Sequence, residues 1–87
     1  MTKRISSIEK NWDLPVKVNT TMEVGAVIQR SRKEQGLTQI DVAGLAGLGE
    51  RFVVELEQGK ETIQMQKAMN VLDLLGLEVV IRKKGAA

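Results

Sequence analysis

Two charged side chains, Glu50 and Arg51, stand next to each other after Gly49, and their chemistry suits the recognition of nucleic-acid bases. An arginine can donate two parallel hydrogen bonds to O6 and N7 of guanine, and a glutamate can accept one from N4 of cytosine. Gly49 has no side chain that could contact a base, and the carboxylate of Glu50 would be repelled by phosphates. Phe52 fits a position in the core. Arg51 is therefore the leading candidate for a base contact, with Val54 on the same segment.

A second group of residues could hold the phosphate backbone. Gln39 follows Thr38, whose hydroxyl can cap a helix, so the free N–H groups at this helix start suit a phosphate oxygen. Lys60, just after Gly59, could reach another phosphate. The alternative for both residues is a solvated position, as a cap residue and as a turn lysine. The candidate DNA contacts are thus Thr38, Gln39, Gly49, Glu50, Arg51, Val54 and Lys60.

These residues can act together only if two short helices, joined by a tight turn, carry them. Gly36 ends one helical pattern and Thr38 begins the next, which Gly47 closes because the residue after a helix often adopts a left-handed conformation. A further helix follows and ends at Gly59. The pattern predicts a helix, a turn of about three to four residues containing glycine, and a second helix.

Two more helices are predicted to flank this pair. The first has about fourteen residues and is capped by Thr20 or Thr21, and the last is capped by Thr62 and ends at Gly76. Gly44, inside a helix, costs about 1 kcal/mol relative to alanine, which suggests that another backbone approaches it closely. Apolar residues at helical spacing form the predicted inner faces: Val24, Ile28, Val42, Ala43, Ala46, Val53, Leu56, Met65, Ala68, Met69, Leu72 and Leu75.

We expect three parts along the chain. Residues 1–20 form an extended N-terminal arm, residues 21–76 the helix-turn-helix domain, and residues 77–87 a C-terminal dimerisation strand with a basic tail. The strand, at residues 77–83, has nothing to pair with inside the chain, so it needs a strand from another molecule. The predicted dimer contacts are Leu77, Val79, Val80 and Ile81.

Trp12 is the only tryptophan and lies in the polar arm. Large aromatic residues are favoured as anchors of interfaces, so Trp12 could bind a partner protein. Alternatively, it folds back over the helical core. Residues 15–18 could add an edge strand to a partner.

Composition excludes several kinds of site. The chain of 87 residues has no Cys, His or Tyr, so disulfides, thiolate or imidazole metal sites, and Cys or His nucleophile systems are excluded. The serines have no histidine to activate them, and the carboxylates form no paired motif. We expect no enzyme and no cofactor. The basic N-terminus lacks the apolar run of a signal peptide, and no segment approaches the ~18 apolar residues of a membrane span, which predicts a cytoplasmic protein.

The formal net charge is only +2, but its distribution is uneven. Residues 21–76 carry six positive and eight negative charges, whereas residues 1–20 and 77–87 each carry an excess of two positive charges. Phosphate binding must therefore come from a local patch or from the ends of the chain.

The segments "GLTQ", "VAGLAGL" and "ELEQGK" resemble the phage-repressor-like (Xre or Cro/C1-type) helix-turn-helix family in their register. The resemblance implies an all-α fold of four to five helices with DNA contacts at the start of the third. Arg32 and Glu57 each continue an apolar face, and the matching family positions often hold an ion pair joining the first helix to the end of the third. We expect this pair to be structural; the alternative is direct contact with DNA.

The segment from Arg51 to Gly85, with its pattern "RFVVELEQGKETIQ" and "VLDLLGLE", resembles the HipB-type antitoxins. In these a short C-terminal β-strand pairs across a dimer. The resemblance implies a homodimeric autorepressor that binds double-stranded operator DNA and restrains a HipA-type Ser/Thr kinase toxin. Two alternatives stay open: a stand-alone Xre-type repressor without a toxin partner, and an interaction module that no longer binds DNA, suggested by Gly49 and Glu50.

Overall fold

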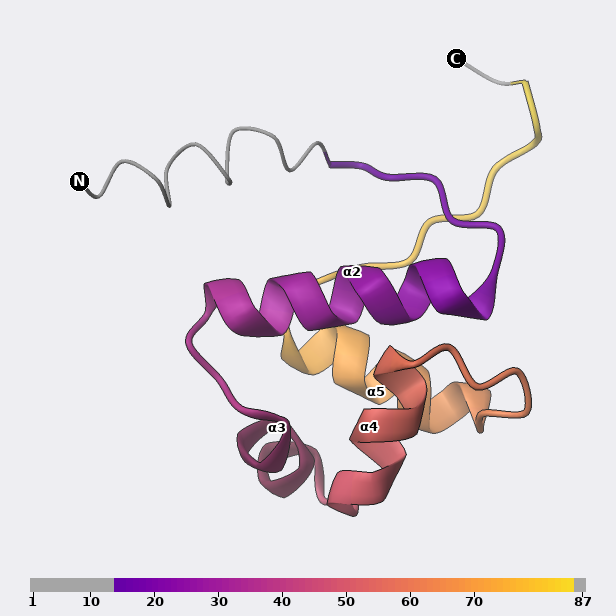
Figure 1. Cartoon of the computed structure of the whole chain (residues 1–87). Helices are drawn as coiled ribbons and strands as arrows, with labels where there is room; N and C mark the ends of the chain where they lie inside the picture. The colour runs from indigo at the N-terminus through magenta and orange to yellow at the C-terminus, as the bar shows by residue number, and fades with distance from the viewer. Residues whose placement is uncertain (1–13, 86–87) are drawn as a thin grey trace.

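The structure is a computed structural model that describes residues 14–85. Four helices lie within these residues (Figure 1): α2 (Thr21–Glu34), α3 (Gln39–Ala46), α4 (Glu50–Glu57) and α5 (Met65–Leu74). The all-helical prediction is thus confirmed for the described part of the chain. No β-strand occurs in it, and residues 77–83 run without regular secondary structure, because a strand needs a partner and the single chain supplies none.

Two capping boxes start α2 and α3. At α2 the cap is Thr20, whose hydroxyl accepts from the Glu23 N–H at 3.1 Å while the Glu23 carboxylate accepts from the Thr20 N–H at 3.2 Å. Thr38 and Asp41 repeat the arrangement at α3, with distances of 3.0 and 2.9 Å. Thr21 is not a cap; its hydroxyl donates to the carbonyl oxygen of Gly59 at 2.7 Å.

The backbone N–H and then the hydroxyl of Thr38 lower the pKa of the Asp41 carboxyl. A lowered pKa in the folded state stabilises the fold above the unfolded pKa, and this contribution is lost as pH falls through the folded pKa. The α3 cap is therefore intact at neutral pH and weakens only in acid.

The core lies where the four helices meet, and its side chains are mostly those expected. Four of them are completely buried: Ile28, Val42, Val53 and Val71. Ala43, Leu56, Ala68 and Leu75 complete the buried cluster. Helices α2 and α4 approach so closely that a Cβ on Gly25 would lie 2.5 Å from the carbonyl oxygens of both Leu56 and Glu57. Gly25 thus sets the distance between these helices.

Two predictions about α5 are wrong. Thr62 does not cap this helix, which begins three residues later at Met65 after Gln64, with no side-chain capping bond. The inner face is predicted correctly at Ala68, Leu72 and Leu75, but it does not include the two methionines: Met65 is 73% exposed and Met69 is exposed, whereas Val71 is fully buried in their place. Buried Ala68, Val71 and Leu75 follow i, i+3, i+7 spacing, so the methionines lie outside the contact.

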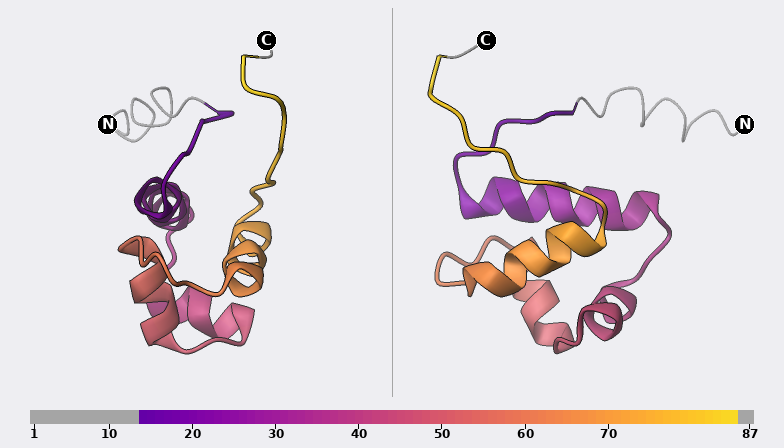
Figure 2. Two further views of the ribbon diagram at one scale, coloured as in Figure 1. Left: turned by 90° about the vertical axis from the view of Figure 1, so that its right-hand side faces the viewer. Right: turned by 180° about the vertical axis from the view of Figure 1, so that it is seen from behind.

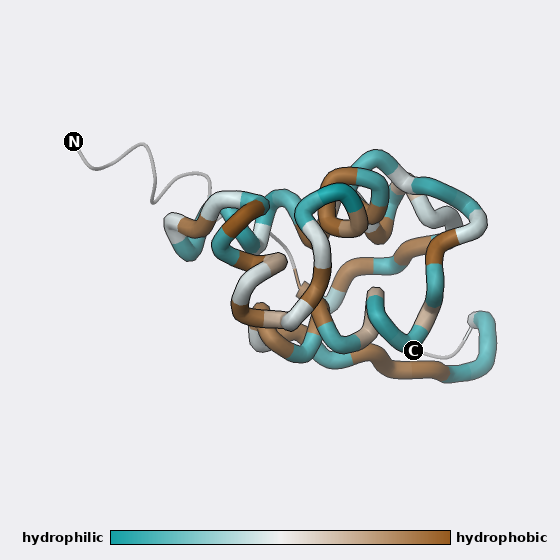
Figure 3. Tube along the Cα trace, turned by 90° about the horizontal axis from the view of Figure 1, so that it is seen from below, coloured by the Kyte–Doolittle hydropathy of each residue, from teal (hydrophilic) through white to brown (hydrophobic). Residues whose placement is uncertain are grey.

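The segments before α2 and after α5 lie on one side of the molecule. Figures 1 and 2 show both on the side of α2 that is opposite to α3, while α4 starts at the far end of the molecule. Figure 3 shows a hydrophobic stretch in the C-terminal segment, followed by hydrophilic residues. Leu77, shortly after α5, still belongs to the helical domain: it packs against the core and its N–H donates to the Leu72 carbonyl at 2.9 Å.

Candidate nucleic-acid interface

Helices α3 and α4 form the predicted helix-turn-helix. Gly47 ends α3 in the left-handed conformation (φ 70°), and Gly49 is the N-cap of α4. Between them Leu48 packs against the core, and its N–H donates to the Ala43 carbonyl at 2.9 Å. The turn therefore consists of residues 47–49 and is held by the core on one side. The angle between the two helices follows from this short connection and from their shared core.

The start of α4 is open. Gly49 supplies no side-chain capping bond, and although the Phe52 N–H donates to the Gly49 carbonyl at 3.1 Å, the N–H groups of Glu50 and Arg51 have no backbone acceptor among the described residues and remain available to a ligand. Glu50 and Arg51 are exposed, and neither has an ion pair or side-chain hydrogen bond within the described residues. The Arg51 guanidinium is thus free to bind an acceptor outside this domain.

The two apolar residues of this turn differ in their surroundings. Phe52 packs against the core, as expected, and the Lys67 ammonium lies 5.9 Å from the centroid of its ring. Val54 is only half-buried and is not among the residues that pack against the buried cluster. Val54 therefore has apolar surface left on α4, whereas Phe52 serves to fix the helix.

A buried polar network joins the three helices of the motif. Arg32 on α2 forms the expected ion pair with Glu57 at the end of α4, through Nε to Oε2 at 2.6 Å and Nη2 to Oε1 at 3.0 Å. The two side chains are 9% and 2% exposed. Gln39 at the start of α3 donates from Nε2 to the same Glu57 Oε1 at 3.0 Å, and Arg32 Nη1 donates to the Leu37 carbonyl at 2.8 Å.

This network changes what Gln39 can offer to DNA. Its amide nitrogen is engaged by Glu57, so the side chain is held in one orientation at the N-terminus of α3. Its backbone N–H belongs to the first turn of α3 and has no backbone acceptor among the described residues. Gln39 therefore combines two properties: it braces the motif, and it leaves an N–H at the positive end of the helix.

Lys60 is placed in the turn after α4, as predicted, but it is not free. Its ammonium lies 3.1 Å from Oε1 of Glu55, and the Lys60 side chain is 47% exposed. Ion pairs this exposed are worth about 0–1 kcal/mol. A phosphate could therefore replace Glu55 as the partner of Lys60 at small cost.

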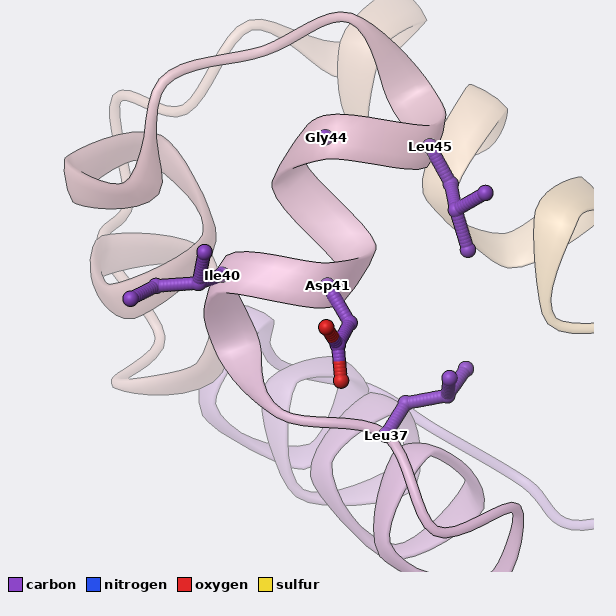
Figure 4. Close-up of a pocket in the computed structure, with 5 residues that line it drawn as sticks. All are labelled: Leu37, Ile40, Asp41, Gly44 and Leu45. Atoms are coloured by element: carbon purple, nitrogen blue, oxygen red, sulfur yellow. The ribbon is translucent and has the colours of Figure 1, made fainter.

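The outer surface of α3 has an open hollow (Figure 4), lined by Leu37, Ile40, Asp41, Gly44 and Leu45. Ile40 and Leu45 are well exposed at its two sides. The close backbone approach expected at Gly44 is wrong, because no atom lies within 4 Å of a Cβ built there. The glycine that does accept a close backbone is Gly25.

Two structural residues were missed from the sequence. Gly25 has a detectable signal, since it lies three residues before Ile28 on the inner face of α2 and a helical glycine usually has a packing reason. Gln35 has none: its amide bridges the Ser31 hydroxyl at 3.2 Å and the Leu75 carbonyl at 2.8 Å, which joins the ends of α2 and α5. Trp12 lies outside the described residues.

Comparison with known proteins supports the same motif. The family model for helix-turn-helix domains matches residues 28–81. The chain belongs to the helix-turn-helix family. Its similarity to the uncharacterized HTH-type transcriptional regulator y4mF of Sinorhizobium fredii (strain NBRC 101917 / NGR234) is 44% identity over 69 residues, covering 79% of this chain and 91% of the relative. This family member is thus a helix-turn-helix transcriptional regulator.

Solved structures with the same fold include one described as "HipB-O4 20mer complex" and one described as "MDT Protein". Each has a TM-score of 0.73 and 16% identity, and the match covers 79% of this chain and 97% of the other. The fold of this helix-turn-helix protein is therefore HipB-like. Within residues 14–85, no helix has the length and hydrophobicity of a membrane span, and no cluster of acidic residues could hold a metal ion.

Proposed function

We propose that this helix-turn-helix protein is a homodimeric transcriptional repressor that binds an operator with the start of α4 in the major groove. The observation that carries the proposal is the open first turn of α4, where exposed, unpaired Arg51 stands on a helix fixed by Phe52 and by the Glu57 network. A rigid helix with free N-terminal groups is the arrangement by which this motif reads base edges.

In this proposal the residues divide into two roles. Arg51 reads a guanine, and Val54 adds apolar contact, whereas Glu50 accepts from a cytosine. The N–H groups beside Thr38 and Gln39, together with Gly49 and Lys60, hold phosphates and set the register on the duplex. Because residues 21–76 carry a net negative charge, the affinity depends on these local contacts more than on a long-range field.

Arg51→Ala is expected to relax the sequence preference by about 1–3 kcal/mol at one base position, since the bidentate contact is lost. Gln39→Ala should instead weaken all sequences alike, because it removes support from the phosphate-binding end of α3. Fluorescence anisotropy with cognate and scrambled duplexes measures both effects. Arg51→Lys is the matched control: it keeps the charge, so the salt dependence stays while discrimination falls. Equal losses on both duplexes for Arg51→Ala would remove it from the base-reading role.

The dimer is proposed to form through the C-terminal segment. Val79, Val80 and Ile81 are exposed, with Ile81 at 93%, and no backbone hydrogen bond of residues 78–85 occurs within the described part of the chain. If this segment pairs with the same segment of a second copy across a two-fold axis, the backbone N–H and C=O groups of both segments gain hydrogen-bond partners. The dimer then presents two α4 helices to half-sites about 34 Å apart, or a multiple of that spacing.

Truncation after Gly76 is expected to give a monomer, because it removes the whole pairing segment while keeping α5 intact. Sedimentation velocity at low micromolar concentration compares the truncated and complete chains. Circular dichroism serves as the control that α2 to α5 remain folded, although the loss of the Leu77 contact lowers their stability slightly. A stable dimer of the truncated chain would show that helix packing holds the two copies together.

A second candidate function is that of a HipB-like antitoxin, which also neutralises a HipA-type Ser/Thr kinase toxin. It is supported by the HipB-like fold and by the sequence pattern from Arg51 to the C-terminal segment. The geometry is compatible with it, because both segments that flank the helices lie away from the start of α4. One face can bind DNA while the other binds a protein. The stand-alone repressor is the alternative.

Calorimetry with the purified product of the neighbouring reading frame separates these two functions. If the protein is an antitoxin, the kinase-like product binds, Trp12→Ala weakens this complex, and operator affinity is nearly unchanged. Arg51→Ala should have the reverse effect. Absence of any complex would overturn the antitoxin function and leave the repressor.

A further inference from the structure

Two segments of the described chain combine exposed β-branched residues with unused backbone groups. We call residues 15–19 the N-terminal segment and residues 78–83 the C-terminal segment. Val16 and Val18 are exposed in the first, and Val79, Val80 and Ile81 in the second. Neither segment makes a backbone-to-backbone hydrogen bond within residues 14–85. Both run on the side of α2 away from α3 (Figure 2).

We propose that the N-terminal segment of one copy adds, as an outer strand, to the C-terminal segment of the second copy. The inference rests on the proposed dimer, in which the two C-terminal segments pair. A ribbon of only two strands is marginally stable and leaves both edges open. Adding one N-terminal segment at each edge gives a four-stranded sheet between the two copies.

The backbone of the N-terminal segment has the asymmetry that an outer strand requires. Alternate residues of a strand direct their N–H and C=O groups to the same neighbour. Pro15 has no N–H, and the N–H of Asn19 is already donated to the Glu23 carboxylate at 2.6 Å. The backbone N–H and C=O groups of the odd-numbered residues therefore point away from the sheet. Those of Val16 and Val18 point toward the neighbouring strand and can form its hydrogen bonds. A proline is tolerated in a sheet at such an edge.

The side chains agree with this arrangement. In an extended segment Val16 and Val18 lie on one face and Lys17 on the other. In the C-terminal segment Val79 and Ile81 share a face, opposite to Glu78. Joining the two apolar faces places Lys17 on the other face of the sheet, which carries both Glu78 and Arg82, so the apolar contact and not a charge pair favours this arrangement.

The second copy, and not the same chain, supplies the partner. Within one chain both segments pass on the same side of α2, and no backbone hydrogen bond joins them. In a dimer with two-fold symmetry, the N-terminal segment of each copy can pair with the C-terminal segment of the other. The same contact is then made twice, and both outer edges of the sheet are covered.

Hydrogen exchange on the complete chain tests the inference. At concentrations where the protein is dimeric, the amides of Val16 and Val18 should exchange at least about tenfold more slowly than that of Lys17. Truncation after Gly76 should abolish this protection. Protection of residues 78–83 without Val16 and Val18 overturns the inference and leaves the proposed dimer, whereas no protection in either segment overturns the dimer as well. Protection of Val16 that survives the truncation also overturns it.

Proline substitution supplies a matched pair of variants. Val18→Pro removes a donor to the ladder and should weaken the dimer about tenfold, since the bond is lost twice per dimer. Lys17→Pro removes an outward N–H and should change the dissociation constant by less than about twofold. Equal effects of the two prolines overturn the proposed orientation. Circular dichroism confirms that the helices are unchanged in both.

Disulfide trapping identifies which copy is the partner, because the chain contains no cysteine of its own. A tagged Val18→Cys chain is mixed with a differently tagged chain that carries Val79→Cys or Ile81→Cys, residues on the same face of the proposed sheet, and oxidised. A cross-link between the two tags supports pairing between copies. A cross-link that forms only within a doubly substituted chain overturns it.

Discussion

Replacing Glu57 by alanine is expected to destabilise the domain by about 3–5 kcal/mol, a large share of the stability of any small domain. The substitution leaves the Arg32 guanidinium buried without its carboxylate and also removes the acceptor of Gln39 Nε2. Both groups would remain out of water without partners. Denaturant unfolding followed by circular dichroism measures the loss as a lower midpoint at similar slope.

The double substitution Arg32→Met with Glu57→Leu is the control for Glu57→Ala. It removes both charges and keeps apolar volume, so its cost should be far smaller than that of the single change. If Glu57→Ala cost less than about 1 kcal/mol, water would have to reach Arg32 in the variant. The pair would then not be the brace of the motif.

Gly25→Ala is expected to cost about 1–3 kcal/mol or more, although alanine is the better helix former. The new methyl group would lie 2.5 Å from the carbonyl oxygens of Leu56 and Glu57, so α2 and α4 would have to separate. This movement also stretches the ion pair that spans the same two helices. Thermal and denaturant unfolding measure the loss, and operator affinity should fall with it.

Gly44→Ala is the matched control for Gly25→Ala, since both glycines lie inside helices. Nothing lies within 4 Å of a Cβ at Gly44, so this substitution should stabilise the protein by up to about 1 kcal/mol. We therefore expect the free energy of unfolding to fall for Gly25→Ala and to rise for Gly44→Ala. A neutral Gly25→Ala would show that α2 and α4 can repack without cost.

The helix-turn-helix could be predicted from the sequence because its signals are local. Thr20, Thr38 and Gly47 mark helix ends through contacts within one turn, and all three were confirmed. Local signals could not predict which side of α5 faces the core. Apolar residues occur all around its short sequence, and only packing against α3 decides that Val71, and not Met65, faces inward.

At the candidate site, the sequence and its family resemblance predicted the Arg32–Glu57 pair but not its third member. Gln39 joins Glu57 across 18 positions, a contact that depends on how α3 and α4 are folded together. The roles of Gly25 and Gly44 also could not be distinguished from the sequence. Both are helical glycines in the sequence, and only the position of a neighbouring helix distinguishes a close contact from open surface. The roles of Arg51 and Lys60 at DNA stay predictions.

The positions of the two flanking segments determine where a label or a fused protein can be attached to this domain. Both segments lie on the side of α2 away from α3, and the first turn of α4 lies at the far end of the molecule. A fluorophore, a surface linker or a fused protein joined beyond either segment would therefore be held away from the end that carries Arg51. Such a fusion would test DNA binding without steric obstruction, and any loss of affinity it caused would report on assembly of the two copies.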